Sequence, residues 1–101
     1  MTLPSGLVLP MAEIAQFCRR YRVRELAVFG SAARGGIRAV SDIDLLVEFH
    51  PHAPGGLLDY PGLMLDLSQL LRRKVDLVDR EGLKPFIRKV VLSEARTIYA
   101  A

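Results

Sequence analysis

A chain of 101 residues, half of them apolar and a quarter charged, has the size and composition of one folded domain and no room for a separate substrate domain. Its net charge of +3 suits an anionic substrate or partner but is too small to predict DNA binding or other direct nucleic-acid binding. A single cysteine excludes an internal disulfide and favours the reducing cytoplasm, and no apolar stretch is long enough to span a membrane. We therefore expect a single domain over residues 1–101, with a core over about 10–101 and an N-terminal extension over 1–9.

Apolar spacing and turn residues predict the elements of the first half of the chain. Helical periodicity predicts a helix over Met11–Tyr21. A short apolar strand over Leu26–Phe29 is expected to end at Gly30, and Ser31–Arg34 has the residues of the first turn of a short helix. After a glycine-containing loop, Ile43–Phe49 is predicted to be a strongly apolar strand.

The second half continues the alternation of helices and strands. The turn-rich segment His50–Gly56 is predicted to be a loop. Helical spacing resumes over Leu63–Leu71, and Lys74–Asp79 is predicted to be a strand. A helix over Leu83–Ala95 and a last short strand over Arg96–Ala100 complete the chain. We therefore expect an α/β fold: a small mixed sheet of three to four strands flanked by helices.

The predicted helix near the C-terminus is amphipathic, so its apolar side is expected to pack inward. The basic side is expected to be solvated, although its cations could also contact an acidic partner. Its apolar side carries Leu83, Phe86, Ile87, Val90 and Val91, and its basic side carries Lys84, Arg88 and Lys89.

Two aspartates lie at the start of the predicted strand Ile43–Phe49. Asp42 and Asp44 are two residues apart, so in a strand their side chains point to the same face. Two adjacent carboxylates repel each other unless a cation, a shared proton or open water stabilises them. Magnesium fits best, because it is usually held by one or two carboxylates together with substrate phosphates. The pair alone leaves open a second interpretation, a capping Asp42 and a solvated Asp44.

Two further features favour the metal interpretation. Gly30 and Ser31 lie between a strand and a helical turn, where backbone N–H groups and the serine hydroxyl can cradle a phosphate. Asp76 lies in an otherwise apolar strand and completes a three-carboxylate cluster if that strand neighbours the strand of Asp42 and Asp44. Asp79 is the competing acid, but its position near the strand end predicts a solvated turn residue.

The combined pattern resembles a known family. "GSAARG", followed by "SDIDLLVEF" and "KVDLVD", is similar to the minimal nucleotidyltransferases, or MNT proteins, of the superfamily related to DNA polymerase β. The resemblance runs from about Leu26 to the C-terminus. It implies that residues 1–101 form one minimal nucleotidyltransferase domain with a polymerase β-like core that binds ATP and Mg²⁺.

The resemblance also implies roles for the motif residues. Asp42 and Asp44 would bind metal, and Asp76 would help to bind the catalytic metal and deprotonate the acceptor. Gly30 and Ser31 would hold the triphosphate. Arg34 matches the arginine of the family motif, either as a phosphate contact or as a brace that pairs with an acid.

Small MNT proteins are similar to the antitoxins of HEPN–MNT toxin–antitoxin pairs. This resemblance implies a type VII-like antitoxin that transfers AMP from ATP to a tyrosine of a HEPN-domain ribonuclease toxin. Two alternatives remain: a binding module that neutralises its partner without catalysis, and a nucleotidyltransferase acting on a small molecule. The resemblance leaves open whether the chain also forms a homo-oligomer.

Other reactive side chains have simpler interpretations. Cys18 falls on the apolar stripe of its helix and is expected to be a structural thiol. His50 and His52 are expected to be solvated loop residues. The basic run Arg72–Lys74 is expected to lie at the end of a helix, where its positive charges interact favourably with the helix dipole. The tyrosines are expected to pack rather than to act as acceptors, and of the three, Tyr21, Tyr60 and Tyr99, only Tyr60, placed in a loop, is a candidate for self-modification.

Overall fold

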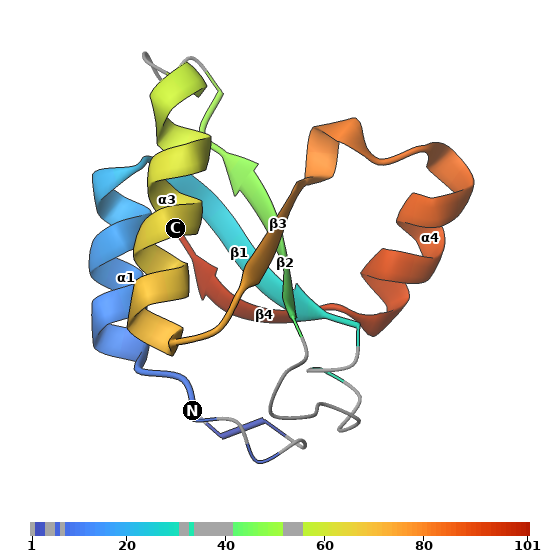
Figure 1. Cartoon of the computed structure of the whole chain (residues 1–101). Helices are drawn as coiled ribbons and strands as arrows, with labels where there is room; N and C mark the ends of the chain where they lie inside the picture. Colours follow the sequence, from blue (N-terminus) through green and yellow to red (C-terminus); the bar gives the residue numbers. More distant parts are fainter. Residues whose placement is uncertain (1, 4–5, 7, 31–32, 34–41, 52–55) are drawn as a thin grey trace.

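The structure, a computed structural model, describes residues 2–3, 6, 8–30, 33, 42–51 and 56–101, with the backbone alone for 56–58. Its sheet has the strand order β3-β2-β1-β4, in which β2 and β3 are parallel and the other neighbours are antiparallel. This small mixed sheet flanked by helices confirms the predicted fold class (Figure 1). The elements are, in chain order, α1 (Met11–Arg20), β1 (Val23–Phe29), β2 (Ile43–Phe49), α3 (Gly56–Leu71), β3 (Val75–Asp79), the 3-10 turn η1 (Arg80–Gly82), α4 (Pro85–Glu94) and β4 (Arg96–Ala100).

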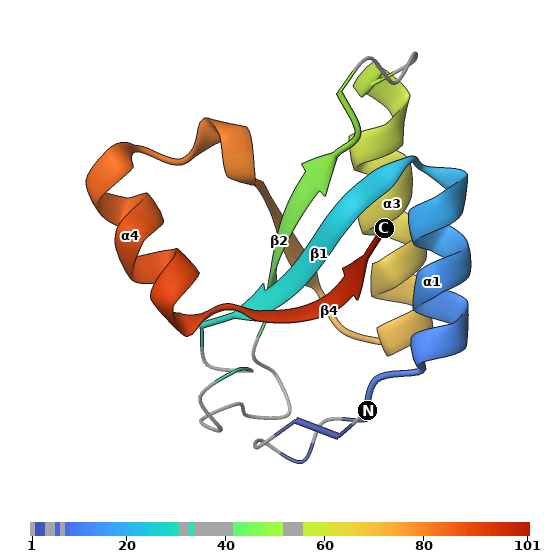
Figure 2. The same cartoon turned by 180° about the vertical axis from the view of Figure 1, so that it is seen from behind.

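The main hydrophobic core lies between the sheet and the helices α1 and α3. These two helices lie side by side on one face of the sheet, while α4 lies on the other side (Figures 1 and 2). Alternate residues of β2, namely Ile43, Leu45 and Val47, are fully buried in this core. Leu63 and Leu67 of α3 pack into the same cluster. The period of two in β2 therefore fixes which face of that strand is apolar.

The N-terminal segment and helix α1 also contribute buried residues to the main core. Leu3 and Leu9 of the predicted N-terminal extension are buried in the main core. Cys18 is fully buried, and this burial raises the pKa of its thiol to about 12. A thiol with so high a pKa is not ionised at neutral pH, so the expected structural role of Cys18 is confirmed.

Helix α3 begins earlier than the sequence predicts. It starts at Gly56 rather than at Leu63 and continues through Pro61. A proline inside a helix removes one backbone hydrogen bond, but packing of the helix against the rest of the protein can offset this loss. The position of a proline therefore does not by itself mark where a helix begins. Tyr60 therefore lies in a helix rather than in a loop, and its hydroxyl donates a hydrogen bond to the carbonyl oxygen of Leu77. The placement of Tyr60 in a loop was wrong, whereas its expected packing role is confirmed, because Tyr60 packs against the main core.

Most of the other boundaries are close to their predictions. The bounds of β2 and β4 are confirmed, whereas β1 begins at Val23, three residues before the predicted start. Gly62 allows the ring of Tyr21 to lie against α3, because a Cβ there would be 2.8 Å from that ring. The predicted loop over 50–56 and the turn over 31–34 fall largely outside the described residues.

The orientation of α4 contradicts the prediction from its amphipathic pattern. Phe86 and Val90 are 74% and 57% exposed, and Val91 is the buried residue of this helix. Arg88, predicted to be solvated, is turned inward and donates from Nη2 to the carbonyl oxygen of Arg80 at 3.2 Å. Only Ala95 separates α4 from β4, so this short connection constrains which side of the helix faces the sheet.

Candidate active site

Two of the three predicted acids, Asp44 and Asp76, lie together at one end of the parallel pair β2 and β3. Asp44 and Asp76 are directly paired in the register of these strands, whose backbones lie about 4.8 Å apart in a typical sheet. Asp44 is half-buried and Asp76 is exposed. Their neighbours Ile43 and Val75 point into the main core, so the two acids lie on the opposite face, the face toward α4. The expectation that Asp76 lies on the strand next to Asp44 is confirmed.

Asp42 precedes β2 and faces a lysine. Its Oδ2 lies 3.8 Å from Nζ of Lys74, and its side chain is 46% exposed. The backbone supports this approach, because the N–H of Ile43 donates to the carbonyl oxygen of Lys74 at 2.9 Å. The prediction assigned Lys74 to a cationic helix end and missed this ion pair. A signal was present in the spacing, because Lys74 precedes Asp76 by two residues and Asp42 precedes Asp44 by two residues. A parallel pairing that places Asp76 beside Asp44 therefore also places Lys74 beside Asp42.

Gly30 places the turn after β1 against Asp44. Its φ of +69° is in the left-handed region, and a Cβ at this position would clash with Oδ2 of Asp44. The residue before it, Phe29, is paired with Asp44 across β1 and β2. A glycine is therefore required here both by the backbone angle and by the nearby carboxylate. Ser31 and Arg34, the other predicted phosphate contacts, lie outside the described residues.

The carboxylates at this end of the sheet have the chemistry that a magnesium ion needs. Among the described residues, no three side chains of aspartate, glutamate, histidine or cysteine already gather around one point as a metal-binding group. Magnesium does not require such a cage, because it keeps several waters and takes one or two carboxylates together with phosphate oxygens. Asp44 and Asp76, with Asp42 two residues before Asp44, supply hard oxygen donors, so the residues present fit the ion.

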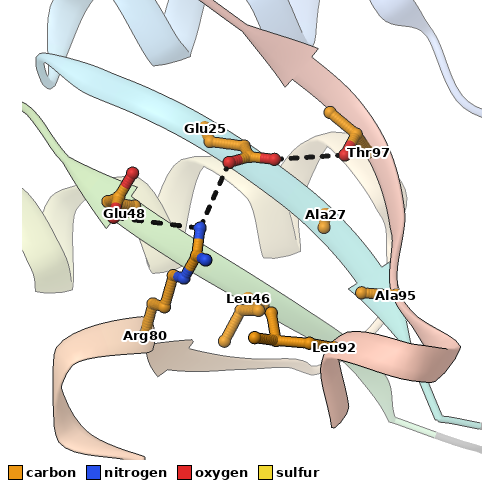
Figure 3. A pocket seen from close by; sticks show the side chains of 8 residues that line it. All are labelled: Glu25, Ala27, Leu46, Glu48, Arg80, Leu92, Ala95 and Thr97. Atoms are coloured by element: carbon orange, nitrogen blue, oxygen red, sulfur yellow. Dashed lines mark hydrogen bonds and ion pairs between the residues drawn. The ribbon is translucent and has the colours of Figure 1, made fainter. Parts of the chain in front are cut away.

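A second polar cluster lies further along the same face of the sheet and was missed by the sequence analysis. It lines a cavity of about 230 Å³ between the sheet and the segment that carries α4 (Figure 3). Glu25 of β1 and Glu48 of β2 are direct partners in the sheet register. Like charges opposite each other destabilise a sheet unless a cation lies between them. The cavity is lined by Glu25, Ala27, Leu46, Glu48, Arg80, Leu92, Ala95 and Thr97.

Arg80 supplies that cation. Its Nη1 lies 3.4 Å from Oε2 of Glu25 and 3.9 Å from Oε2 of Glu48 (Figure 3). Thr97 of β4 also donates to Oε1 of Glu25 at 3.2 Å. Because Arg80 belongs to η1, this network ties the connection between β3 and α4 to the sheet. The cluster is a structural tie, separate from the carboxylates at the other end of the face.

The fold defines a class of protein. A mixed four-stranded sheet with helices on its faces is the fold of the minimal nucleotidyltransferases, and a solved structure of a candidate minimal nucleotidyltransferase has the same arrangement. That structure is 42% identical to this chain and superposes with a TM-score of 0.74, covering 85% of this chain and 86% of its own. The chain belongs to the nucleotidyltransferase domain family, whose sequence profile matches residues 11–98.

The chain is also similar to a protein adenylyltransferase and to a chain of a toxin–antitoxin structure. The protein adenylyltransferase MntA of Thermococcus cleftensis is 45% identical over 75 residues, which is 74% of each chain. The crystal structure of a toxin–antitoxin with AMP-PNP contains a chain that superposes with a TM-score of 0.73. That chain is 22% identical, with 92% of this chain and 75% of the other covered, so it shares the fold.

Proposed function

We propose that this chain is a Mg²⁺-dependent protein adenylyltransferase and a type VII-like antitoxin. It transfers AMP from ATP to a tyrosine of a HEPN-domain ribonuclease toxin and thereby neutralises the toxin. The observation that carries this proposal is the register of Asp44 with Asp76, beside a glycine that admits no side chain. The similarity to a protein adenylyltransferase supports the reaction, and the similarity to a toxin–antitoxin structure supports the partner.

The three aspartates are assigned to two tasks, metal binding and proton transfer. Asp42 and Asp44 would hold the ion, and Asp76 would help to hold it and would accept the proton of the attacking tyrosine hydroxyl. The hydroxyl oxygen forms a bond to the α-phosphorus of ATP while the bond to pyrophosphate breaks. The magnesium ion, when bound, neutralises charge on the phosphates. Asp76 is suited to proton transfer because its side chain is exposed and open to an incoming acceptor.

The glycine turn holds the nucleotide. With no side chain at Gly30, the backbone at this position can approach a phosphate closely. Ser31 donates a hydroxyl to the triphosphate, and Arg34 contacts a phosphate or pairs with an acid. The acceptor tyrosine comes from the partner, and the similarity to a chain of a toxin–antitoxin structure supports this assignment.

The proposal places the chain and its partner in the cytoplasm. Within the described residues, no helix is both long enough and apolar enough to cross a membrane. The single cysteine, Cys18, is free and buried.

Mass spectrometry tests this proposal directly. A HEPN-domain ribonuclease toxin is incubated with the chain, ATP and Mg²⁺, and we expect its tyrosine to gain one or more AMP groups. Asp42→Asn with Asp44→Asn should reduce transfer at least about a thousandfold, because each lost charge weakens binding of the ion. Asp59→Asn on α3 is the matched control and should retain transfer. Transfer that persists in the double variant would show that the metal assignment is wrong.

One observation also favours a second candidate function, a binding antitoxin in which catalysis is secondary. The apolar side of α4 is exposed, as in a surface that contacts another protein. Under this alternative, Asp42→Asn with Asp44→Asn would still bind the toxin and inhibit its ribonuclease activity. Under the enzymatic proposal, the same variant would bind but leave the toxin active.

A further inference from the structure

Helix α4 carries most of the large apolar side chains that the described residues expose. Of their six exposed large apolar side chains, four lie on this one helix of ten residues. Figures 1 and 2 show α4 standing away from the sheet, on the side opposite α1 and α3. Contiguous exposed apolar patches on small soluble proteins commonly mark interaction sites. The four side chains belong to Phe86, Ile87, Val90 and Leu92.

The outer face of α4, which we define as Phe86, Ile87, Lys89 and Val90, has helical continuity. Phe86 and Val90 are four residues apart, so they are neighbours along one side of the helix. Lys89 lies beside them and is exposed. The inward side of α4 carries Val91, which packs with Ala27 and Leu46 of the sheet. The helix is therefore anchored on one side and open on the other.

The charge around this face indicates the chemistry of its occupant. Lys84 and Lys89 are exposed, and neither side chain forms a hydrogen bond or ion pair with any other described residue. A second copy of the chain related by a two-fold axis would bring the same cations together, which disfavours self-association. A partner helix with an apolar stripe and flanking carboxylates would satisfy both the apolar residues and the lysines.

The outer face lies on the same side of the sheet as the acids. Phe29, the register partner of Asp44, packs against the small cluster that contains Val91. A protein bound on α4 would therefore lie on the side of the sheet from which Asp44 and Asp76 project. Docking there would bring an acceptor toward the acids without covering them.

We propose that the outer face of α4 is the docking surface for the acceptor protein, which binds through a helix with an apolar stripe flanked by carboxylates. This inference rests on the proposed function and deepens it, because it assigns recognition of the acceptor to residues separate from the acids. Lys84 and Lys89 orient the complex, and Phe86 and Val90 provide the buried contact.

The test measures binding in the absence of nucleotide, so that it does not depend on transfer. The probe is a HEPN-domain ribonuclease toxin, the same protein that is used in the transfer assay, titrated with the full chain by calorimetry. Phe86→Ser with Val90→Ser should weaken Kd at least about tenfold, as expected when central apolar contacts are removed. Leu65→Ser is the matched control, because Leu65 is 58% exposed on α3, and its Kd should stay within about twofold of wild type. Lys84→Glu with Lys89→Glu should weaken Kd severalfold in low salt and less in 0.5 M NaCl.

The outcomes separate this inference from the proposed function. In one outcome, the wild type binds the toxin tightly, the α4 variants bind it weakly, and the wild type transfers no AMP. This outcome would support docking on α4 and overturn the enzymatic proposal. AMP transfer with equal Kd values for wild type and α4 variants would overturn docking alone. An absence of any wild-type complex would also overturn it. Wild-type dimers that become monomers in Phe86→Ser with Val90→Ser would assign the face to a second copy. Binding to phosphatidylserine vesicles that the same variant loses would assign it to a membrane; either result overturns the proposal.

Discussion

The two faces of the sheet are built for different tasks. Among the described residues, the face under α1 and α3 has a core cluster of sixteen buried side chains, whereas the face toward α4 has a cluster of three. The face toward α4 instead carries Asp44, Asp76 and the network of Arg80 with Glu25 and Glu48. Charged groups are costly to bury, so a face that carries them cannot also be thickly covered. The comparison indicates that one face stabilises the fold and leaves the other free for chemistry and binding.

The largest expected effect compares two adjacent leucines of β2 that point to opposite faces. Leu45 is fully buried in the main core, and Leu46 is 5% exposed beside the cavity. Leu45→Ala should lower the free energy of unfolding by about 4 kcal/mol, and Leu46→Ala by about 2 kcal/mol, because the second site borders existing space and can relax. Urea unfolding measures both values. Equal losses would show that the α4 face is packed as firmly as the other.

The next effect concerns the glycine beside the acids. Gly30→Ala forces a side chain into a left-handed backbone and against Oδ2 of Asp44, so it should cost about 2 kcal/mol of stability. It should also reduce AMP transfer, because Asp44 must move. Gly82→Ala is the control, since a Cβ at Gly82 meets no atom within 4 Å, and its stability should change by less than about 0.5 kcal/mol. If Gly30→Ala left both stability and transfer unchanged, the close approach to Asp44 would be irrelevant to function.

A smaller effect is expected from the ion-pair network on the α4 face. Arg80→Met leaves Glu25 and Glu48 facing each other without their shared cation and should cost about 1 kcal/mol. Arg20→Met, which removes an exposed pair with Asp66, should cost less because the Arg20 side chain is 63% exposed. Adding Glu48→Gln to Arg80→Met should recover part of the loss. Thermal unfolding at low and high salt measures these differences, and an unchanged Tm for Arg80→Met would contradict the role of the network.

The sequence predicted the elements and the acids better than it predicted what covers the sheet. The bounds of β2 and β4 agree with the predicted strands, and the pairing of Asp44 with Asp76 follows from strand order. Pro61 obscured the start of α3, because local propensity does not reveal the packing that holds a helix through a proline. The side of α4 that faces the sheet was also predicted incorrectly, because the sequence pattern does not show what packs against the helix. Periodicity identifies an apolar side, but it does not say whether the same chain or a partner covers it. The network of Glu25 with Arg80 joins residues 55 positions apart, and no local pattern indicates such a contact.

The smallest expected effect tests the well-packed face through its pH dependence. The hydroxyl of Tyr21 donates to Oδ2 of Asp66 at 2.5 Å, linking α1 to α3, and this hydrogen bond raises the pKa of Tyr21 above its ordinary value of 10.0. The unfolded chain therefore loses this proton first as pH rises, so the contribution is fully present below pH 10 and is lost as pH passes through the folded pKa. Tyr21→Phe should cost about 0.5 kcal/mol at pH 7, and the difference from wild type should shrink in the alkaline range. Burial also raises the pKa of Tyr60, but this residue is present in both proteins and its effect cancels in the difference. Urea unfolding across the range from neutral to alkaline pH measures the difference. A constant difference would show that the contact contributes through packing rather than through its proton.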